Sequence, residues 1–428
     1  MIRHCLALLL ATGLGLVAAP RPAAAVEVTI SCGALGQELE LCRDGAEAWA
    51  RQSGHSVKIV SVPNSASERL ALYQMMLAGA APQIDIYQID VVWPGILGRH
   101  FIDLKPFSDG AEAQHFPAII ANNTVEGRLI AMPLYTDAGV LFYRRDLLEK
   151  HGRAVPATWE ELTETAAFIQ QAERAAAQGD PRGGPALWGY VFQGRAYEGL
   201  TVNALEWVAS AGGGTILDRQ GHITIDNAAA RDALARAGGW IGHIAPEGVL
   251  TYTEEEARGL FQSGHAVFMR NWPYAWALAQ GEDSPVRGKV AIAPLPRESG
   301  DAPTGVLGGW NLGVSRYSRH PAEAAALVMY LTGPAEQKRR AVAAAYNPTL
   351  PALYEDAEVL AANPFFRTLF PSFSGAVARP SLAAGSKYNR VSNAFWTRVH
   401  AVLAGRQQAD PALEGLAHDL RRIGRRGW

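Results

Sequence analysis

The chain has 428 residues, of which 48% are hydrophobic and 19% are charged. This balance is typical of a globular protein with two or more domains. With 39 basic and 41 acidic residues the chain has no strong field of either sign, which argues against a nucleic-acid-binding protein. Beyond the N-terminus no apolar run reaches the length of a membrane span.

The first 25 residues have the three parts of an export signal. Arg3 supplies the positive start, residues 5–17 form an apolar run, and three alanines at 23–25 give a small-residue cleavage site. We therefore predict a cleavable signal peptide at 1–25 and export to the periplasm of a double-membraned bacterium.

Two cysteines remain after the signal is removed, Cys32 and Cys42. Cys32 follows a predicted strand, and Cys42 falls in a predicted helix that begins near Gln37. A strand–turn–helix can bring such positions together, and an even pair in an oxidising compartment favours a disulfide. The alternative is two buried free thiols.

Strands and helices alternate along the first part of the chain. The patterns predict strands at 26–31, 57–62, 84–89, 129–133 and 140–144, and helices at 39–52, 67–78 and 159–177. Ser65 or Ser67 would cap the second helix, and Thr158 with Glu161 forms a capping box for the third. Further helices are predicted at 321–331, 334–345 and 386–403. The alternation predicts an α/β fold with mostly parallel sheets.

The common motifs of enzyme chemistry are missing from the sequence. It has no phosphate-binding Gly-x-x-x-x-Gly-Lys-Ser/Thr, no Gly-x-Ser-x-Gly and no His-Glu-x-x-His, and its eleven histidines lack the spacing of metal ligands. We therefore expect no catalytic residue, no metal and no cofactor. The acidic run at 254–256 is interpreted as the solvated start of a helix, where it would favour the helix dipole.

Aromatic residues beside glycine and proline mark a candidate binding surface. Trp272, Tyr274 and Trp276 lie in one segment, and Trp310 follows Gly309 in another. Aromatic faces held on rigid turns can stack on the C–H faces of sugar rings. The alternative for any one of these tryptophans is an ordinary place in the core.

Three carboxylates lie near predicted strand ends. Asp90 ends the strand at 84–89, Asp137 follows residues 129–135, and Glu38 begins the first helix after the first strand. Ligands of open α/β sheets bind beyond the carboxyl ends of strands, so these groups are expected at one rim. They would serve as acceptors for sugar hydroxyls or as a glycosidase pair, and each one singly could instead be a helix cap or turn former.

Several longer motifs occur in order along the chain. They are Gln-Ile-Asp-Val-Val-Trp at 88–93, Pro-Leu-Tyr-Thr-Asp-Ala-Gly at 133–139, Tyr-Arg-Arg-Asp-Leu-Leu at 143–148, Gln-Gly-Arg-Ala-Tyr-Glu-Gly-Leu at 193–200, Arg-Asn-Trp-Pro-Tyr-Ala-Trp at 270–276, Leu-Gly-Gly-Trp at 307–310 and Ala-Arg-Pro at 378–380. With these motifs the chain resembles the trehalose/maltose-binding proteins of ABC importers, within the family of extracellular sugar-binding proteins.

The resemblance implies a two-lobed periplasmic binding protein fold of type II, with hinge-linked lobes whose central sheets are flanked by helices. The first lobe would comprise 26–135 plus 292–343, and the second 136–291 plus 344–428. Hinge crossings are expected near 135–139, 290–293 and 341–346. The family pattern places the following residues around the ligand: Glu38, Arg69, Asp90, Tyr135, Asp137, Trp272, Gly309, Trp310 and Arg379. Tyr274, beside Trp272, is a further candidate for stacking on a sugar ring.

The function that this resemblance implies is capture of an α-linked disaccharide, such as trehalose or maltose, for an ABC permease in the inner membrane. The protein would be a monomer without enzymatic activity. The alternatives are a binding protein for another solute, such as a polyol, another glycoside, a polyamine or a glycerol phosphate ester, and an exported carbohydrate-active enzyme. The cysteine pair, Asn311 after Trp310, and the segment after Pro380 depart from the family pattern, so the sugar's identity stays open.

Overall fold

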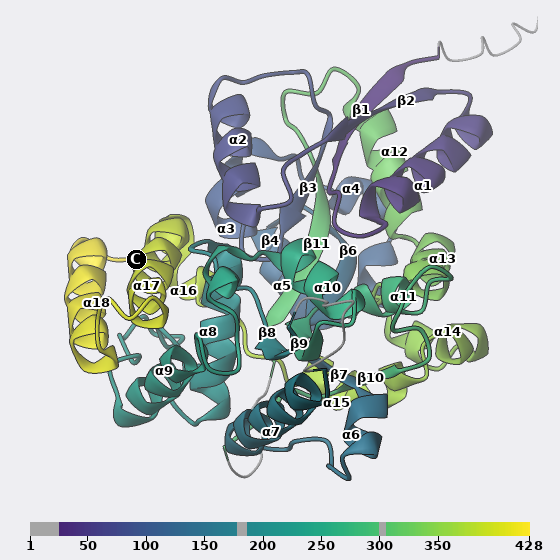
Figure 1. The fold of residues 1–428 in the computed structure, drawn as a ribbon. Coiled ribbons are helices and arrows are strands. Elements are labelled where there is room, and N and C mark those ends of the chain that lie inside the picture. Colours follow the sequence, from purple (N-terminus) through teal and green to yellow (C-terminus); the bar gives the residue numbers. More distant parts are fainter. Residues whose placement is uncertain (1–24, 178–185, 299–304) are drawn as a thin grey trace, which may run out of the picture.

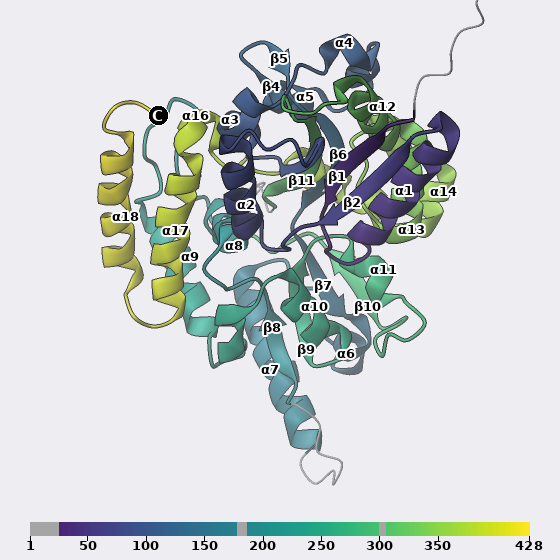
Figure 2. The same ribbon diagram turned by 90° about the horizontal axis from the view of Figure 1, so that it is seen from above.

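The computed structural model describes residues 25–177, 186–298 and 305–428, so the proposed signal peptide, apart from Ala25, lies outside the described residues. The chain forms two lobes, each built on its own sheet with helices around it (Figure 1). Viewed from above, the two sheets lie in separate halves of the molecule (Figure 2). This two-lobed architecture agrees with the fold that the family resemblance implied.

The first lobe contains a five-stranded sheet in the order β2-β1-β3-β11-β6. Strand β3 lies between β1 and β11 and is buried along its whole length, including its polar residues Gln88 and Asp90. The strand bounds are β1 Glu27–Cys32, β2 Ser56–Ser61, β3 Ile86–Asp90, β6 Met132–Ala138 and β11 Leu307–Val314, and a separate small ribbon joins β4 Thr124–Val125 to β5 Arg128–Leu129.

The second lobe contains a four-stranded sheet in the order β10-β7-β9-β8. Beside it lies a cluster of aromatic rings in which Trp159, Trp207 and Trp240 are fully buried against one another and their neighbours. These three tryptophans are therefore core residues. The strand bounds are β7 Val140–Arg144, β8 Trp188–Val191, β9 Ala266–Asn271 and β10 Val290–Ala293.

The expectation of mostly parallel sheets is wrong. In the first sheet β1 runs parallel to β2 and β3, but β11 is antiparallel to both β3 and β6. In the second sheet only β8 and β9 are parallel. The mixture arises because the chain passes between the lobes and re-enters a sheet without a helical crossover, and strands joined that way need not be parallel.

Helices cover the sheets of both lobes. Their starts follow local capping rules: the Ser65 hydroxyl accepts a hydrogen bond from the Glu68 amide, and Thr158 and Glu161 form the expected reciprocal box. Around the first sheet lie α1 Glu38–Ser53, α2 Ala66–Ala78, α3 Pro94–Leu97, α4 Lys105–Ser108, α5 Pro117–Asn123, α12 Pro321–Thr332, α13 Pro334–Ala344 and α14 Ala357–Ala362.

The second lobe carries most of the remaining helices. At its outer side α17 packs against α8, α9 and α18, which places the end of the chain on the flank of this lobe (Figure 1). The bounds are α6 Arg145–Lys150, α7 Trp159–Ala177, α8 Glu198–Ser210, α9 Ala228–Trp240, α10 Glu254–Gln262, α11 Ala275–Ala279, α15 Phe365–Ser374, α16 Ser381–Ala384, α17 Tyr388–Leu403 and α18 Ala409–Gly424. Among the described residues no helix is both long and apolar enough to cross a membrane.

The chain passes from one sheet to the other within short segments. Strand β6 ends at Ala138 in the first sheet and β7 begins at Val140 in the second, so Gly139 alone separates them. A side chain at Gly139 would collide with the carboxylate of Glu206 and the guanidinium of Arg270, so only glycine fits there. The return passage lies between Ala293 at the end of β10 and the start of β11.

Candidate functional site

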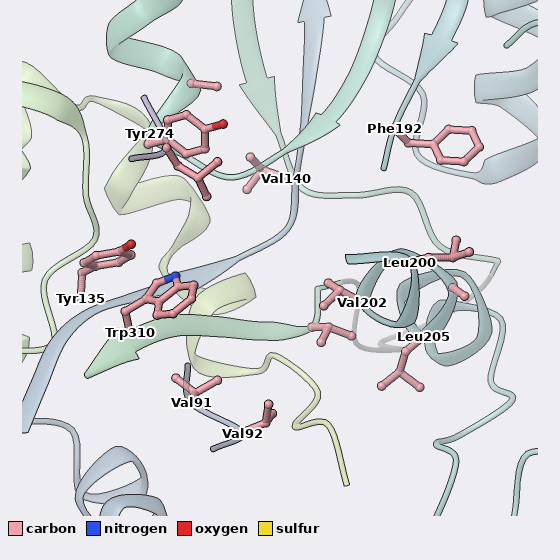
Figure 3. Packing of buried hydrophobic residues seen from close by; sticks show 14 of the residues in the cluster. Val91, Val92, Tyr135, Val140, Phe192, Leu200, Val202, Leu205, Tyr274 and Trp310 are labelled. Atoms are coloured by element: carbon pink, nitrogen blue, oxygen red, sulfur yellow. The ribbon is translucent and has the colours of Figure 1, made fainter. Parts of the chain in front are cut away.

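Three strands of the first sheet bring site residues side by side. Trp310 on β11 is in register with Asp90 on β3 and with Tyr135 on β6. Directly paired residues on neighbouring strands point to the same face of a sheet. The sheet thus groups a carboxylate, an indole and a phenol that are far apart in the sequence, and Figure 3 shows Tyr135 and Trp310 beside each other.

Gly309 allows this arrangement. Its φ is +121°, a conformation that L side chains rarely adopt, and a Cβ there would lie 2.5 Å from the carbonyl oxygen of Tyr135. The ladder between β11 and β6 shifts register directly after it, between Trp310 and Asn311. Gly309 therefore contributes a close backbone approach rather than a side chain, as is usual for glycine at a bulge.

Trp272 comes from the segment between β9 and α11 in the second lobe. Its ring lies against Gly308, where a Cβ would be 2.7 Å from the indole, and 4.0 Å from the guanidinium carbon of Arg270. Tyr274 follows it, and its hydroxyl donates to Glu255 at 2.6 Å. Trp276 instead packs against Phe365, with ring centroids 5.4 Å apart, and belongs to the core rather than to the site.

A cavity lies between the two sheets, and we call it the interlobe cavity. Its volume is about 50 Å³, room for only a few water molecules, since each needs roughly 10–15 Å³ on this measure. A sugar would therefore enter only when the lobes move apart. The cavity is lined by Leu35, Asn64, Ala66, Asp90, Tyr135, Asp137, Tyr197, Glu198, Gly199, Val202, Glu254, Trp272, Tyr274, Gly308, Gly309, Trp310, Tyr346 and Arg379.

Arg379 connects the two lobes across this cavity. One terminal nitrogen donates to Asp90 at the end of β3, at 2.9 Å, and the other donates to Glu198 at the start of α8, at 2.7 Å. All three side chains are buried, and Glu198 also accepts from the hydroxyls of Tyr388 and Ser392. Burial raises the pKa of Glu198, and the positive charge of Arg379 opposes part of that rise.

Eight of the ten predicted site residues line the interlobe cavity, and the two exceptions lie just behind it. Glu38 accepts hydrogen bonds from the Tyr135 hydroxyl and the Gln88 amide, so it holds Tyr135 from the side away from the cavity. The Arg69 guanidinium lies 4.1 Å from the Trp310 ring centroid, and its Nε donates to the carbonyl of Pro63. Both residues support groups that face the cavity.

The cavity also contains carboxylates to which sequence reasoning gave no binding role. Glu198 stands inside the motif at 193–200, which carried the resemblance but suggested no role for it. Glu254 was expected in solvent at the start of a helix, and this is wrong: it is buried, it lines the cavity, and it accepts from Tyr197 at 2.8 Å. Helix α10 begins where the lobes face each other, which the sequence of the helix alone does not reveal.

Asp137 differs chemically from Asp90. Burial raises its pKa well above the ordinary value of 3.8, and the nearby Glu38 carboxylate adds to the rise. Its carboxylate lies 3.5 Å from the Asn347 amide and, within the described residues, is bonded to no arginine, whereas Asp90 is bonded to Arg379. The two aspartates of the cavity wall thus stand in different electrostatic surroundings. Within the described residues no cluster of histidine, cysteine or acidic side chains has the arrangement of a metal site.

Comparison with known proteins agrees with this architecture. Residues 42–338 match the family model described as bacterial extracellular solute-binding protein. A "Probable ABC transporter-binding protein" of Deinococcus radiodurans is 52% identical over 413 residues, 96% of this chain and 97% of that protein. The structure titled "Maltose bound T. maritima MalE3" has a TM-score of 0.87 and 38% identity, covering 93% of this chain and all of that one.

A more distant structure has the same fold. It is a solute-binding protein of Thermotoga lettingae bound with α-D-tagatose, with a TM-score of 0.81 and 21% identity, and it covers 94% of this chain and all of its own.

Proposed function

Because the chain belongs to the family of bacterial extracellular solute-binding proteins, which are components of ABC transporters and not enzymes, we propose that its ligand is a sugar held in the interlobe cavity. The finer proposal is an α-linked disaccharide such as trehalose or maltose, delivered to an ABC permease in the inner membrane. The maltose bound by the T. maritima relative supports this choice.

One observation carries the proposal: two tryptophans from opposite lobes line a cavity that is also lined by carboxylates and an arginine. Trp272 and Trp310 offer flat apolar surfaces, and Asp90, Asp137 and Arg379 offer charged or strongly polar hydrogen-bonding groups. A sugar ring has two apolar faces and a rim of hydroxyls, so it matches both kinds of wall.

The ten residues predicted from the sequence keep their proposed roles with one distinction. The eight that line the cavity would contact the ligand, and Glu38 and Arg69 would act through Tyr135 and Trp310 in the conformation described here. We propose that the lobes divide at Gly139 and between β10 and β11, a few residues beyond the boundaries expected from the sequence, and that closure occurs around these segments. Export to the periplasm and a monomeric state complete this proposal.

The second candidate ligand is a monosaccharide or polyol. The tagatose bound by the more distant structural relative supports it. Because that relative is only 21% identical, its ligand is a weaker guide than maltose.

Calorimetry of the purified mature protein against maltose, trehalose, tagatose and mannitol tests the proposal. We expect micromolar or tighter binding of one of the two disaccharides, about −8 kcal/mol or more favourable. Binding of tagatose or mannitol alone would select the second candidate. If none of the four sugars binds, the proposed function is wrong.

A further inference from the structure

A disulfide joins Cys32 and Cys42, with the two Cα atoms 6.4 Å apart. Cys32 is the last residue of β1 and is fully buried, and Cys42 lies on α1 one helical turn after Glu38. We call residues 33–41 the disulfide loop. The bond therefore ties the first turn of α1, which carries Glu38, to the end of a central strand.

Inside the disulfide loop, Glu38 is the hub of a buried network. Its carboxylate accepts hydrogen bonds from the backbone amide of Leu35, the side-chain amide of Gln88 and the hydroxyl of Tyr135. The backbone amide of Gly33 in turn donates to Gln88. A Cβ on Gly33 would overlap the Glu38 carboxylate, so the loop backbone passes directly over it. The position of the carboxylate thus depends on the path of the loop.

The disulfide loop also contacts residues at one end of the interlobe cavity. Leu35 lines the cavity, and its carbonyl accepts from the Tyr346 hydroxyl at 3.0 Å. Gly36, with φ at +54°, lies so close to Tyr274 of the second lobe that a Cβ would be 2.6 Å from that ring. Tyr346 is in turn a ring neighbour of both Tyr135 and Tyr274, with centroids 4.8 Å and 6.3 Å away. The loop is therefore the support for three tyrosines that line the cavity.

The direction of one hydrogen bond links this network to the ligand. The Tyr135 side chain lines the cavity, and its hydroxyl donates its proton to Glu38, so the Glu38 carboxylate fixes the direction of the phenol O–H and leaves the oxygen lone pairs as acceptors. A displaced carboxylate would free the phenol to rotate its proton toward the cavity and to compete as a donor. Correct placement of Glu38 thus determines which hydrogen bond Tyr135 offers.

We propose that the Cys32–Cys42 disulfide is a positioning element of the ligand site, which acts through Glu38 on Tyr135. This inference rests on the proposed function, because it concerns the affinity for the bound sugar. Neither cysteine lines the interlobe cavity. The disulfide holds the loop in its binding geometry before the ligand arrives, so that less ordering accompanies binding. Without it the dissociation constant should rise about tenfold.

A coupling experiment separates this role from a contribution to folding alone. Calorimetry would compare the wild type, the Cys32→Ala/Cys42→Ala variant, Glu38→Gln, and the variant that combines all three changes, at a temperature where each is folded. We expect the paired alanine changes to weaken sugar binding about tenfold in the wild-type background and hardly at all once Glu38 is glutamine. A purely structural disulfide would lower the melting temperature but leave no such dependence on Glu38.

Two further measurements test whether a loss of affinity comes from the missing disulfide, rather than from the missing cysteine side chains, and whether it acts through Tyr135. Wild type reduced with a phosphine keeps both sulfur atoms and should show the same loss of affinity as the alanine variant. Tyr135→Phe, which lacks the hydroxyl that Glu38 accepts from, should abolish the effect as Glu38→Gln does. Equal losses in all backgrounds, or unchanged affinity without the disulfide, would overturn the inference. Failure of the wild type to bind any sugar would instead overturn the proposed function.

Discussion

The two tryptophans of the site are supported in different ways, although each lies on a buried arginine. In the first lobe Trp310 is 4.1 Å from the Arg69 guanidinium, and in the second Trp272 is 4.0 Å from that of Arg270. Each of the three side-chain nitrogens of Arg270 has a hydrogen-bond partner: two pair with Glu206 at 2.6 and 2.8 Å, and the third donates to Gln193 at 3.1 Å. Arg69 donates only from Nε, and its two terminal nitrogens have no hydrogen-bond partner in the described part of the chain.

The two arginines therefore differ: Arg270 is held in place by hydrogen bonds from all its side-chain nitrogens, whereas Arg69 keeps N–H groups that bond to no described residue. The Arg270–Glu206 pair lies beside Gly139 and Val306, where the chain passes between the sheets, so it fixes Trp272 to the hinge region. Among the described residues Arg69 has no such ion pair, so it supports Trp310 through the stacking contact and is itself held by one hydrogen bond to the Pro63 carbonyl. The two arginines thus lie at similar distances from their tryptophans, but only Arg270 also ties its tryptophan to the hinge region.

The largest expected effect comes from Arg270→Met. It leaves the Glu206 carboxylate buried without its partner, and breaking a buried pair in this way costs about 3–5 kcal/mol of folding stability. Arg69→Met leaves no paired carboxylate behind, so we expect a folded protein that has lost mainly sugar affinity. Denaturant unfolding and calorimetry on both variants check the contrast.

A control for this comparison is the combined Arg270→Met/Glu206→Gln variant. It should recover part of the lost stability, because the unpaired charge is gone. Equal destabilisation by the Arg69 and Arg270 substitutions would contradict the distinction between the two supports.

The tryptophans themselves give the next contrast. Trp310 is buried and packs edge-on against Trp93 at 5.4 Å, so Trp310→Ala should cost about 3–5 kcal/mol of stability in addition to affinity. Trp272 is only partly buried, so Trp272→Ala should reduce stability clearly less. Both changes should weaken sugar binding at least about tenfold, or 1.4 kcal/mol. Wild-type affinity in both variants would exclude ring stacking.

Arg379→Lys tests the connection between the two lobes. An ammonium group has no planar fork, so it cannot hold Asp90 and Glu198 at once in the present geometry. We expect about tenfold weaker binding and a smaller ligand-induced decrease in the radius of gyration, measured by small-angle scattering. Full compaction of this variant at saturating sugar would show that the two ion pairs are not needed for closure.

The smallest effect at neutral pH is expected for Asp137→Asn. Its raised pKa means that the folded protein keeps a proton above pH 3.8 that the unfolded chain releases, so this group makes stability fall as pH rises from about 4 toward the folded pKa. An asparagine resembles the protonated acid and should flatten that slope while largely preserving affinity. Urea unfolding across this pH range, with Asp90→Asn as the comparison, checks the sign. An unchanged slope would mean that Asp137 is ionised in the folded protein.

Local features of the fold were predictable because short-range rules determine them. The capping box at Thr158 and the helix at 159–177 follow from neighbouring residues, and the structure agrees with the predicted start of this helix to the residue. Asp90, Tyr135 and Trp310 could be predicted as site residues because they stand in motifs that resemble a known family. Their arrangement in direct register on three strands could not, since it depends on pairings between distant segments.

The α/β class follows from the alternating patterns of the sequence by itself, and the cysteine pair can be read from it directly. The two-lobed fold and eight of the residues that line the cavity follow from motifs in the sequence that resemble a known family. Only the tertiary structure decided the mixed strand directions, the place of Glu254 in the cavity and the pairing of Arg379 with Glu198. Each of these depends on how the chain returns from one lobe to the other. A charged residue is solvated if its helix face points outward and buried if that face points toward the other lobe. The packing of the lobes determines which of the two occurs.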